Sequence, residues 1–305
     1  MTQPILGPLQ ALSKCPLCGD AGRKALFLLK ESTLYECEAC RLRYLDPCLS
    51  EAAMKSAYES SHSLTRLHSF HEGYYEYGDL DKESKTLADF RRGLEILEKY
   101  VKGRKAPSIL DVGFGNGLFL ALARQRGWRV QGVDHNTQNV ELARKKFSLD
   151  CQQVDLEDYE NEGFLYDVIS FWDVIEHLPD PHRVLRKAAS LLKPDGLVLA
   201  AVPNDRSFLT LAASGLYHLS FGRIKKGIEA IYLLEHVAYY NRETLTALLE
   251  KNGFQGRESF LTSTDLAKYK LSAGDKLLAS ILLRIGKLTG LENRLVAIFQ
   301  KNKTL

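Results

Sequence analysis

Residues 108–117 read Ser-Ile-Leu-Asp-Val-Gly-Phe-Gly-Asn-Gly, an apolar run that leads into three alternating glycines. The apolar part predicts a buried strand, and the glycines predict a sharp turn into a helix over 117–126. The G-x-G-x-G spacing differs from that of dinucleotide-binding turns, because Leu118 stands where the G-x-G-x-x-G pattern needs its last glycine. A carboxylate at Asp111 would repel a pyrophosphate but can accept hydrogen bonds from an ammonium group. The turn therefore favours a cationic ligand over NAD.

Strand-like and helix-like segments alternate through the rest of the chain. The expected strands cover 108–114, 129–134, 151–156, 166–172, 197–202, 259–263 and 294–300. The expected helices cover 85–102, 117–126, 137–147, 181–192 and 241–251. Such βαβ alternation predicts an α/β fold, with a parallel sheet covered on both faces. Ligands of these sheets bind beyond the carboxyl ends of the strands.

Two further acids stand at the ends of expected strands. Asp134 closes the second strand, where a carboxylate can bind a ribose diol. Asp155 closes the third strand, where a carboxylate could accept a hydrogen bond from an exocyclic amine. Together with Asp111, these acids predict a site for a cationic amino acid joined to a neutral nucleoside.

This pattern resembles the class I S-adenosylmethionine-dependent methyltransferases. The resemblance covers 85–305 and continues through 170–181 (SFWDVIEHLPDP), 191–199 (LLKPDGLVL) and 235–240 (EHVAYY). It implies a Rossmann-like, seven-stranded methyltransferase sheet whose last strand is antiparallel. It also implies an S-adenosylmethionine site with the methionine part near Asp111, Gly113, Gly115 and Gly117. By the same resemblance the ribose would contact Asp134, the adenine Asp155 and Leu156, and the methyl group Phe171, Trp172 and Asp173.

Four of the six cysteines stand in two C-x-x-C pairs near the start of the chain, namely Cys15, Cys18, Cys37 and Cys40. Their spacing lies within the C-x₂-C-x₁₅₋₂₀-C-x₂-C pattern of zinc sites. Four thiolates complete a tetrahedral Zn²⁺ site without an open position, so the metal would be structural. Disulfides and an iron–sulfur cluster are the rival interpretations. The strand-like segments between the pairs favour a small zinc ribbon.

We expect three parts along the chain. A zinc ribbon would cover 1–48, a helical linker or N-terminal lid 49–104, and the methyltransferase domain 105–305. A lid insertion is expected at 204–240, where aromatic segments precede a basic cluster that could take a diphosphate. A helical hairpin packed on the sheet is the alternative for this insertion. The linker contains a histidine group (His62, His68 and His71) whose spacing favours a solvated or substrate-facing segment over a metal site.

Methyl transfer from a sulfonium to a hydroxyl or a carbon acid also requires removal of a proton. His177 and His236 are the candidate bases, because imidazole titrates near neutral pH. The alternative for His177 is a structural role, in which Glu176 and His177 cap the following turn and brace the cofactor loop. Residues 173–177 also resemble the E-x-x-E-H metal box of some quinone and small-RNA methyltransferases, with Asp173 in the first position.

The full architecture resembles bacterial enzymes that methylate sugars or related metabolites. We expect the acceptor to be a small molecule such as a sugar, a nucleotide sugar or a related metabolite, with or without a phosphate group. An RNA base methyltransferase, which would use the ribbon to recognise nucleic acid, is one alternative. A quinone-type O-methyltransferase and a non-catalytic module that binds S-adenosylmethionine are the others.

Composition limits the classes that remain. Of the 305 residues, 45% are apolar and 26% charged, which excludes global disorder. The formal net charge of +3 does not favour nucleic acid as the partner. We expect a cytoplasmic protein, because the start of the chain lacks a secretory signal and no apolar run reaches about 18 residues. An amphipathic helix over 276–288 is expected to cover a sheet rather than to contact a membrane.

Overall fold

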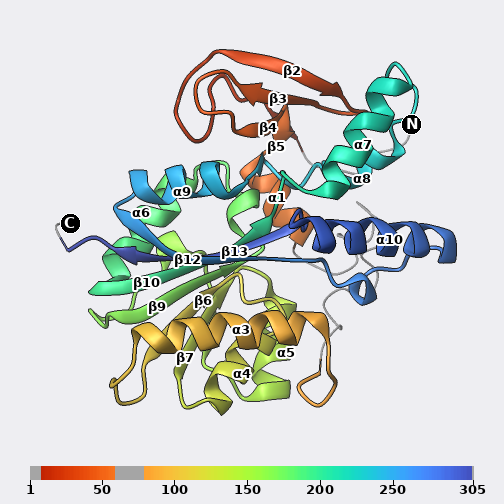
Figure 1. Ribbon diagram of the computed structural model, residues 1–305. Helices are drawn as coiled ribbons and strands as arrows, with labels where there is room; N and C mark the ends of the chain where they lie inside the picture. The colour runs from red at the N-terminus through yellow and green to blue at the C-terminus, as the bar shows by residue number, and fades with distance from the viewer. Residues whose placement is uncertain (1–7, 59–78, 304–305) are drawn as a thin grey trace.

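The computed structural model describes residues 8–58 and 79–303. A seven-stranded sheet in the order β8-β7-β6-β9-β10-β13-β12 forms its centre (Figure 1). The strands from β8 to β10 are mutually parallel, whereas β13 runs antiparallel to both of its neighbours. Its strands are β6 (Ser108–Val112), β7 (Arg129–Asp134), β8 (Cys151–Gln153), β9 (Tyr166–Trp172), β10 (Leu192–Pro203), β12 (Phe254–Thr262) and β13 (Arg294–Lys301). The expected methyltransferase-type sheet is confirmed.

Helices cover both faces of this sheet, as the βαβ alternation predicts. Three lie on one face and two on the other, and each face has its own apolar core (Figure 1). The first face carries α3 (Lys85–Tyr100), α4 (Leu118–Gln125) and α5 (Thr137–Phe147), and the second α6 (Pro181–Leu191) and α9 (Arg242–Lys251). The strands between them are buried on both sides, which explains their nearly continuous apolar sequences.

Capping side chains set where these helices begin. The side chains of Ser84, Asn136 and Asp180 each accept a hydrogen bond from the backbone N–H three residues later. Asn241 forms a reciprocal capping box with Thr244 at the start of α9. Such caps satisfy backbone donors that have no partner within the helix. They place the helix starts within a residue of the positions expected from the sequence.

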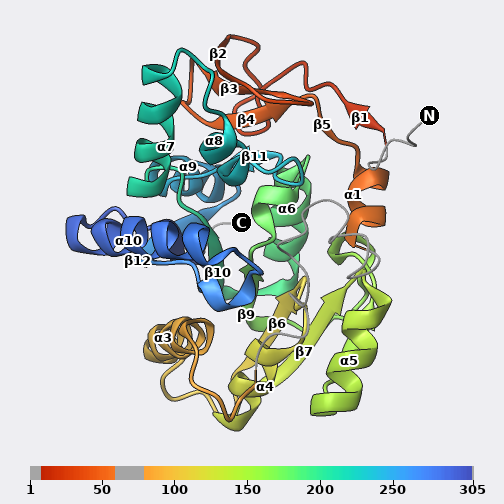
Figure 2. The same ribbon diagram turned by 90° about the vertical axis from the view of Figure 1, so that its right-hand side faces the viewer.

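The N-terminal segment forms a second, smaller sheet above the main one. Strands β2 (Arg23–Leu28), β3 (Thr33–Cys37) and β4 (Arg43–Asp46) are antiparallel, and β11 (Ala238–Tyr239) joins them at the edge of β4 (Figure 2). A two-stranded ladder of β1 (Leu9–Gln10) and β5 (Cys48–Leu49) leads into α1 (Glu51–Tyr58). The ribbon sheet therefore contains a strand from the insertion, nearly two hundred positions later in the chain.

The insertion folds into two helices, α7 (Phe208–Leu219) and α8 (Lys226–Ile231), followed by β11. Helix α7 packs beside α10 (Ala273–Thr289), and both lie away from the main sheet (Figures 1 and 2). We expected the amphipathic helix to cover a sheet. Instead Gly286 is the buried residue of α10, and several of its leucines are exposed.

Part of the expected linker lies outside the described residues, including the histidine group His62, His68 and His71. None of the helices in residues 8–58 and 79–303 combines the length and apolar character needed to cross a bilayer.

Candidate functional site

A cavity of about 440 Å³ lies beyond the carboxyl ends of β6, β7 and β9. From β6 the chain proceeds to β7 and β8 on one side, and then returns to β9 on the other side of β6. Such a reversal of strand order opens a crevice in which α/β sheets bind their ligands. The cavity has the size of a small-molecule site.

The glycine turn after β6 forms the near wall of the cavity. Gly113, Gly115 and Gly117 all have positive φ, at 65°, 57° and 78°. A Cβ at Gly113 would lie 2.7 Å from Val174, and one at Gly117 2.8 Å from Leu149, so neighbouring side chains require both glycines. A Cβ at Gly115 would meet no atom within 4 Å. Gly115 also lines the cavity.

Asp111 lies at the bottom of the cavity and is 1% exposed. The hydroxyl of Ser170, its partner on β9, donates a hydrogen bond of 2.7 Å to one carboxylate oxygen. Burial raises the pKa of Asp111 to about 8. A cationic ligand would reverse this effect, because an adjacent ammonium favours the ionised carboxylate.

Asp134 is buried at the end of β7 and fixes the loops around it. Its carboxylate accepts hydrogen bonds from the backbone N–H groups of Gly115 (3.0 Å) and Asn136 (2.8 Å) and from the side chain of Asn139 (3.1 Å). Two carboxylate oxygens have about four acceptor positions, so one remains for a hydroxyl group of a ligand. Asp134 therefore holds the glycine turn beside the position expected for a ribose.

Asp155 and Leu156 line the opposite end of the cavity. Leu156 is buried, whereas Asp155 is partly exposed and forms a 2.6 Å ion pair with Lys55 of α1. Lys55 also lies 3.4 Å from Glu51. Asp155, which is expected to accept a hydrogen bond from an adenine amine, therefore already has a cationic partner in Lys55.

The three residues expected near a methyl group have different surroundings. Phe171 is fully buried in the core and does not line the cavity. Trp172 lines it and stacks edge-on against Phe90. Asp173 also lines it, has a φ of 58°, and is held by Arg294 through contacts of 2.8 and 2.9 Å. A non-glycine residue in this backbone region is strained, a feature that clusters at functional sites.

The two candidate bases lie side by side at the cavity wall. The ring centroids of His177 and His236 are 4.6 Å apart. Nδ1 of His177 lies 2.8 Å from the carbonyl oxygen of Glu235, which can only accept, so Nδ1 carries the proton. The hydroxyl of Tyr58 lies beside the same ring, 3.2 Å from Nδ1 and 3.4 Å from Nε2. Burial lowers the pKa of His177, so its ring is neutral at pH 7.

Glu176 lies directly behind this pair, and both of its carboxylate oxygens are buried without a hydrogen-bond partner among the described residues. Burial raises its pKa well above the usual range. One ligand atom from each of Glu176, His177 and His236 falls within 4.8 Å of the others, so this group could hold a divalent ion. Asp173, the expected first member of a metal box, is not in this group, and its carboxylate is paired with Arg294.

The side of the cavity opposite the glycine turn is polar. It is lined by Thr264, Asp265, Lys268, Tyr269, Asn293 and Arg294. Burial and the nearby Arg294 lower the pKa of Lys268 to about 8. Burial also raises the pKa of Tyr269 to about 12. None of the cations expected to take a diphosphate (Arg223, Lys225 and Lys226) lines this cavity.

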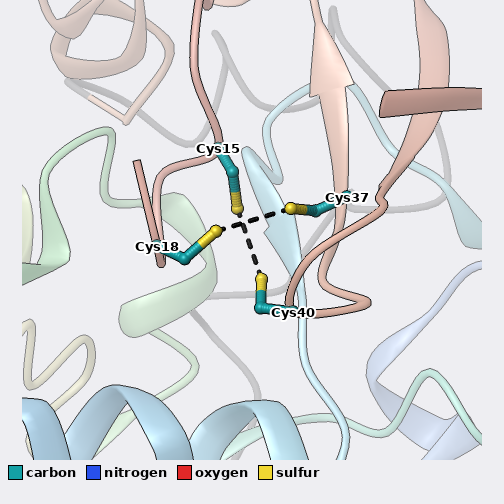
Figure 3. Close-up of side chains that lie close together, drawn as sticks. All are labelled: Cys15, Cys18, Cys37 and Cys40. Carbon is teal, nitrogen blue, oxygen red and sulfur yellow. Dashed lines mark hydrogen bonds between the residues drawn. The ribbon is translucent and has the colours of Figure 1, made fainter. Parts of the chain in front are cut away.

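The four paired cysteines converge in the ribbon (Figure 3). The Sγ atoms of Cys15 and Cys40 are 3.5 Å apart, those of Cys18 and Cys37 are 3.4 Å apart, and all four lie within 4.8 Å of one another. Tetrahedral zinc with Zn–S bonds of ~2.3 Å requires S–S separations of about 3.8 Å. The donor set and its spacing therefore fit a four-coordinate metal.

The two cysteine knuckles repeat one backbone pattern. In each, the residue after the second cysteine donates its N–H to the carbonyl of the first, from Gly19 to Cys15 at 2.9 Å and from Arg41 to Cys37 at 3.0 Å. Both of these residues have positive φ, 78° for Gly19 and 64° for Arg41. Glycine adopts this conformation without strain, whereas arginine does so only where the surroundings impose it.

Hydrogen bonds connect the ribbon to the wall of the cavity. The N–H of Leu45 in β4 donates to the carbonyl of Val237 (3.0 Å), and the N–H of Val237 donates to the carbonyl of Glu176 (2.8 Å). Arg43 of the same strand forms an ion pair of 3.1 Å with Asp205, just after β10. The segment with His236 is thus held between the ribbon and the turn with His177.

Several cavity residues were missed by sequence reasoning. Lys55 comes from α1, before the methyltransferase motifs, and Lys268 and Arg294 come from the end of the chain. The one available signal was the position of Arg294 at the start of an expected strand. Its side chain could be placed only once β13 was known to lie beside β10.

Comparison with known proteins agrees with this geometry. The family model described as "Methyltransferase domain" matches residues 83–259. A ubiquinone biosynthesis O-methyltransferase of Neisseria meningitidis serogroup C is 31% identical over 159 residues, which are 48% of this chain and 66% of that protein. Its counterpart from Actinobacillus pleuropneumoniae serotype 5b is 31% identical over 121 residues, 36% of this chain and 52% of that protein. The matches thus span between half and two thirds of these relatives.

Two solved structures share the fold at low sequence identity. The 1,6-didemethyltoxoflavin-N1-methyltransferase of Burkholderia thailandensis aligns with a TM-score of 0.52 and 15% identity, over 92% of this chain and all of that one. The magnesium protoporphyrin IX methyltransferase of Synechocystis PCC 6803 aligns with a TM-score of 0.51 and 16% identity, over 82% of this chain and 99% of that one. Because the family model matches more than half of its length, this chain belongs to the class I S-adenosylmethionine-dependent methyltransferases.

Proposed function

We propose that the protein transfers a methyl group from S-adenosylmethionine to a hydroxyl oxygen of a small-molecule acceptor, a sugar, nucleotide sugar or related metabolite. The pairing of His177 with His236 at the wall of the cofactor cavity carries this proposal. The O-methyltransferase names of the two bacterial relatives support oxygen as the acceptor atom.

The cofactor would lie along the carboxyl edge of the sheet. In this proposal Asp111 and the turn with Gly113, Gly115 and Gly117 hold the methionine part, and Asp134 accepts from the ribose. Asp155 and Leu156 border the adenine, so Lys55 must share the Asp155 carboxylate with the exocyclic amine. Trp172 and Asp173 flank the methyl end, and the buried Phe171 supports them from the core.

The donor sulfonium is already activated, so the protein mainly aligns the acceptor and removes its proton. The proposed base is His236, because it comes from the insertion and lines the cavity. The neutral ring of His177 lies against it and is fixed by the Glu235 carbonyl. The Tyr58 hydroxyl lies within 3.4 Å of both ring nitrogens of His177.

The polar side of the cavity favours a hydroxylated acceptor over an apolar one. Asp265, Lys268 and Asn293 offer hydrogen-bonding groups there, and Tyr269 offers an aromatic face. A buried polar group costs free energy unless a partner satisfies it, so a polyhydroxylated ligand suits this lining.

A second candidate is a quinone-type O-methyltransferase, which the names of the two relatives favour. Its phenolic acceptor would have lower proton affinity than a sugar hydroxyl and would depend less on a base. Dependence on His236 therefore distinguishes the two acceptors.

We also propose that the cysteine cluster holds a structural zinc ion, supported by the sulfur separations. In the proposed division of the chain, 1–48 form the zinc ribbon, 49–104 the linker and 105–305 the methyltransferase domain, with an insertion at 204–240. The shared strand pairing of β4 and β11 supports a ribbon that stabilises the insertion.

Labelled S-adenosylmethionine tests the function. The full chain is incubated with methyl-labelled cofactor and separate panels of sugars and nucleotide sugars, catechols and RNA. We expect label in the first panel and tenfold or greater loss for His236→Ala with unchanged S-adenosylhomocysteine affinity. Label in catechols supports the second candidate, label in RNA rejects both, and cofactor binding without label in any panel indicates a non-catalytic module.

A further inference from the structure

Exposed apolar side chains gather on one part of the molecule. Of the twelve large apolar residues that are exposed among the described ones, nine lie on α7, the turn after it and α10. We call these nine the α7–α10 surface: Leu211, Leu216, Leu219, Phe221, Ile224, Leu277, Leu278, Ile281 and Leu288. Soluble monomers rarely expose apolar residues in such a group unless the group binds something.

Two contacts place the two parts of this surface side by side. The N–H of Phe208 at the start of α7 donates to the carbonyl of Leu291, just after α10 ends. At the other end, Lys226 forms a 2.8 Å ion pair with Asp275 in the first turn of α10. The chain from α7 to α8 therefore runs alongside α10, and both project from the body of the protein (Figure 2).

The three most exposed residues of this surface lie at the end of α7, in the turn after it and near the end of α10. Phe221 is 90% exposed, Leu219 82% and Leu288 80%. Phe221 and the following Gly222 both have positive φ, so the chain turns sharply there. Within α10, Leu277, Ile281 and Leu288 follow one another at helical spacing and share one side of the helix.

Positive charge accompanies these apolar side chains. The segments 208–231 and 273–289 contain six Lys or Arg residues and two acids, Glu229 and Asp275. Asp275 is already paired with Lys226. The cations are Arg223, Lys225, Lys226, Lys276, Arg284 and Lys287. Apolar residues surrounded by cations are typical of a surface that lies in the headgroup region of an anionic membrane.

We propose that the α7–α10 surface docks the protein on a lipid bilayer that contains anionic headgroups. A bilayer offers an apolar layer for Phe221 and Leu288, and above it a negative layer for the lysines and arginines. A second copy of the chain fits less well, because a twofold contact would bring two copies of the same net-positive surface together. Long Lys and Arg side chains can reach the headgroups while the apolar groups beside them are buried.

Docking would bring the cavity close to the bilayer. Lys268 and Tyr269 line the cavity and precede α10 by a few residues, and Leu233 lines it and follows α8. A methyl acceptor attached to a lipid would then reach the cavity from the membrane side. This consequence rests on the proposed function, whereas the docking itself does not.

Co-sedimentation of the full chain with vesicles tests the proposal. The vesicles are phosphatidylcholine alone, or phosphatidylcholine with 30 mol% phosphatidylglycerol, in 0.1 M and 0.5 M NaCl. We expect at least about tenfold stronger partition onto the anionic vesicles at low salt, because each nearby cation adds to the attraction. High salt should reduce this difference, since it screens surface charge.

Two variants with matched controls separate the apolar and the charged contributions. Phe221→Ser/Leu288→Ser removes apolar groups, and its control is Leu165→Ser on another exposed leucine. Arg223→Gln/Lys287→Gln removes charges, and its control is Lys102→Gln/Lys105→Gln. Both test variants should lose vesicle binding, and the controls should keep it. S-adenosylhomocysteine affinity should be unchanged in all of them, which shows that they fold.

Three outcomes would overturn the proposal. The first is a wild-type chain that sediments with neither vesicle, and the second is equal binding by the test variants and their controls. The third is a dimer in light scattering that Phe221→Ser/Leu288→Ser dissociates, since the surface would then join two copies. Methyl transfer to a soluble acceptor is measured in parallel, so failure of docking and failure of the proposed function are distinguished.

Discussion

Ala238 of the insertion pairs with Tyr44 of the N-terminal ribbon in an antiparallel ladder. The preceding residue, Val237, connects the same ladder to the carbonyl of Glu176. His236 therefore lies next to a strand whose other partner is the cysteine-rich ribbon. The position of a candidate base thus depends on a small sheet that lies outside the main methyltransferase fold.

Loss of one cysteine ligand should impair turnover more than cofactor binding. In Cys40→Ser the cluster would lose one of the four sulfur ligands of the proposed zinc ion, and we expect β4 to hold β11 and the segment with His236 less firmly. We expect turnover to fall tenfold or more while S-adenosylhomocysteine affinity changes less than threefold. Zinc content, turnover and calorimetry provide the measurements. Cys48→Ser is the control, because Cys48 is buried in the ribbon segment outside the cluster. Equal loss in both variants would contradict the prediction.

Gly115→Ala and Gly117→Ala should fail in different ways. Both introduce a side chain at positive φ, which costs ~1 kcal/mol. At Gly115 the new methyl would meet no atom within 4 Å, so we expect the fold to remain, and because Gly115 lines the cavity we expect the methyl to narrow the cofactor site. At Gly117 it would lie 2.9 Å from Ala143 and destabilise the packing of α5. Thermal unfolding and calorimetry should show lost affinity in the first variant and a lower Tm in the second.

Binding of the cofactor should release a proton near neutral pH. Without ligand, burial raises the pKa of Asp111 to about 8, so the group is mostly protonated at pH 7. A bound ammonium group would ionise it, so affinity should rise by roughly tenfold per pH unit between pH 6 and 7. Calorimetry in buffers of different ionisation enthalpy measures the released proton. Asp111→Asn should bind weakly, with no such pH dependence.

The same group affects the stability of the ligand-free protein. Because burial raises the pKa of Asp111 in the folded protein, its protonated form adds to the free energy of unfolding. This stabilisation is fully present below the unfolded pKa of ~3.9 and is lost as the pH rises through about 8. Asparagine does not titrate, so the Asp111→Asn variant does not lose this stabilisation as the pH rises. The Tm of the ligand-free variant should therefore fall less than that of the wild type between pH 6 and 9, which a thermal scan can measure. An identical fall in both proteins would show that Asp111 does not titrate in this range.

His236 and His177 should differ in their pH profiles. His236→Ala removes the proposed base, so turnover should fall about a hundredfold with cofactor affinity retained. Burial already keeps the His177 ring neutral at pH 7, so His177→Gln should lower turnover by a factor that is constant between pH 7 and 9. A bracing role of His177 would appear as lost S-adenosylhomocysteine affinity in that variant. Tyr58→Phe tests whether the hydroxyl beside the His177 ring contributes to turnover.

Much of the central fold could be predicted because its signals are local. The strands at 129–134 and 166–172 have the expected bounds, since buried parallel strands read as apolar runs that end in turns. The start of β10 was missed, because its first part contains Pro194 and Gly196 before the register shifts at Leu197. The pairing of β11 with β4 had no local signal, since it depends on contacts between distant segments.

The residues of the candidate site also divide into those with a local sequence signal and those without one. Asp111, Asp134 and the glycines belong to one continuous stretch with recognisable spacing, and the cavity includes most of them. Lys55 and Arg294 are isolated charges in the sequence, and only the packing of α1 and the order of the strands bring them to the cavity. Side chains that only tertiary packing brings together have no recognisable spacing in the sequence.

Helix α1 contacts two separate parts of the cavity wall, through Lys55 at Asp155 and through Tyr58 at His177. A nucleoside that enters or leaves must therefore disturb contacts that belong to one eight-residue helix. We therefore expect the release of S-adenosylhomocysteine, which must break these contacts, to be slower than the methyl transfer itself. A burst of methylated acceptor in the first turnover, absent in Lys55→Ala, is the expected kinetic signature.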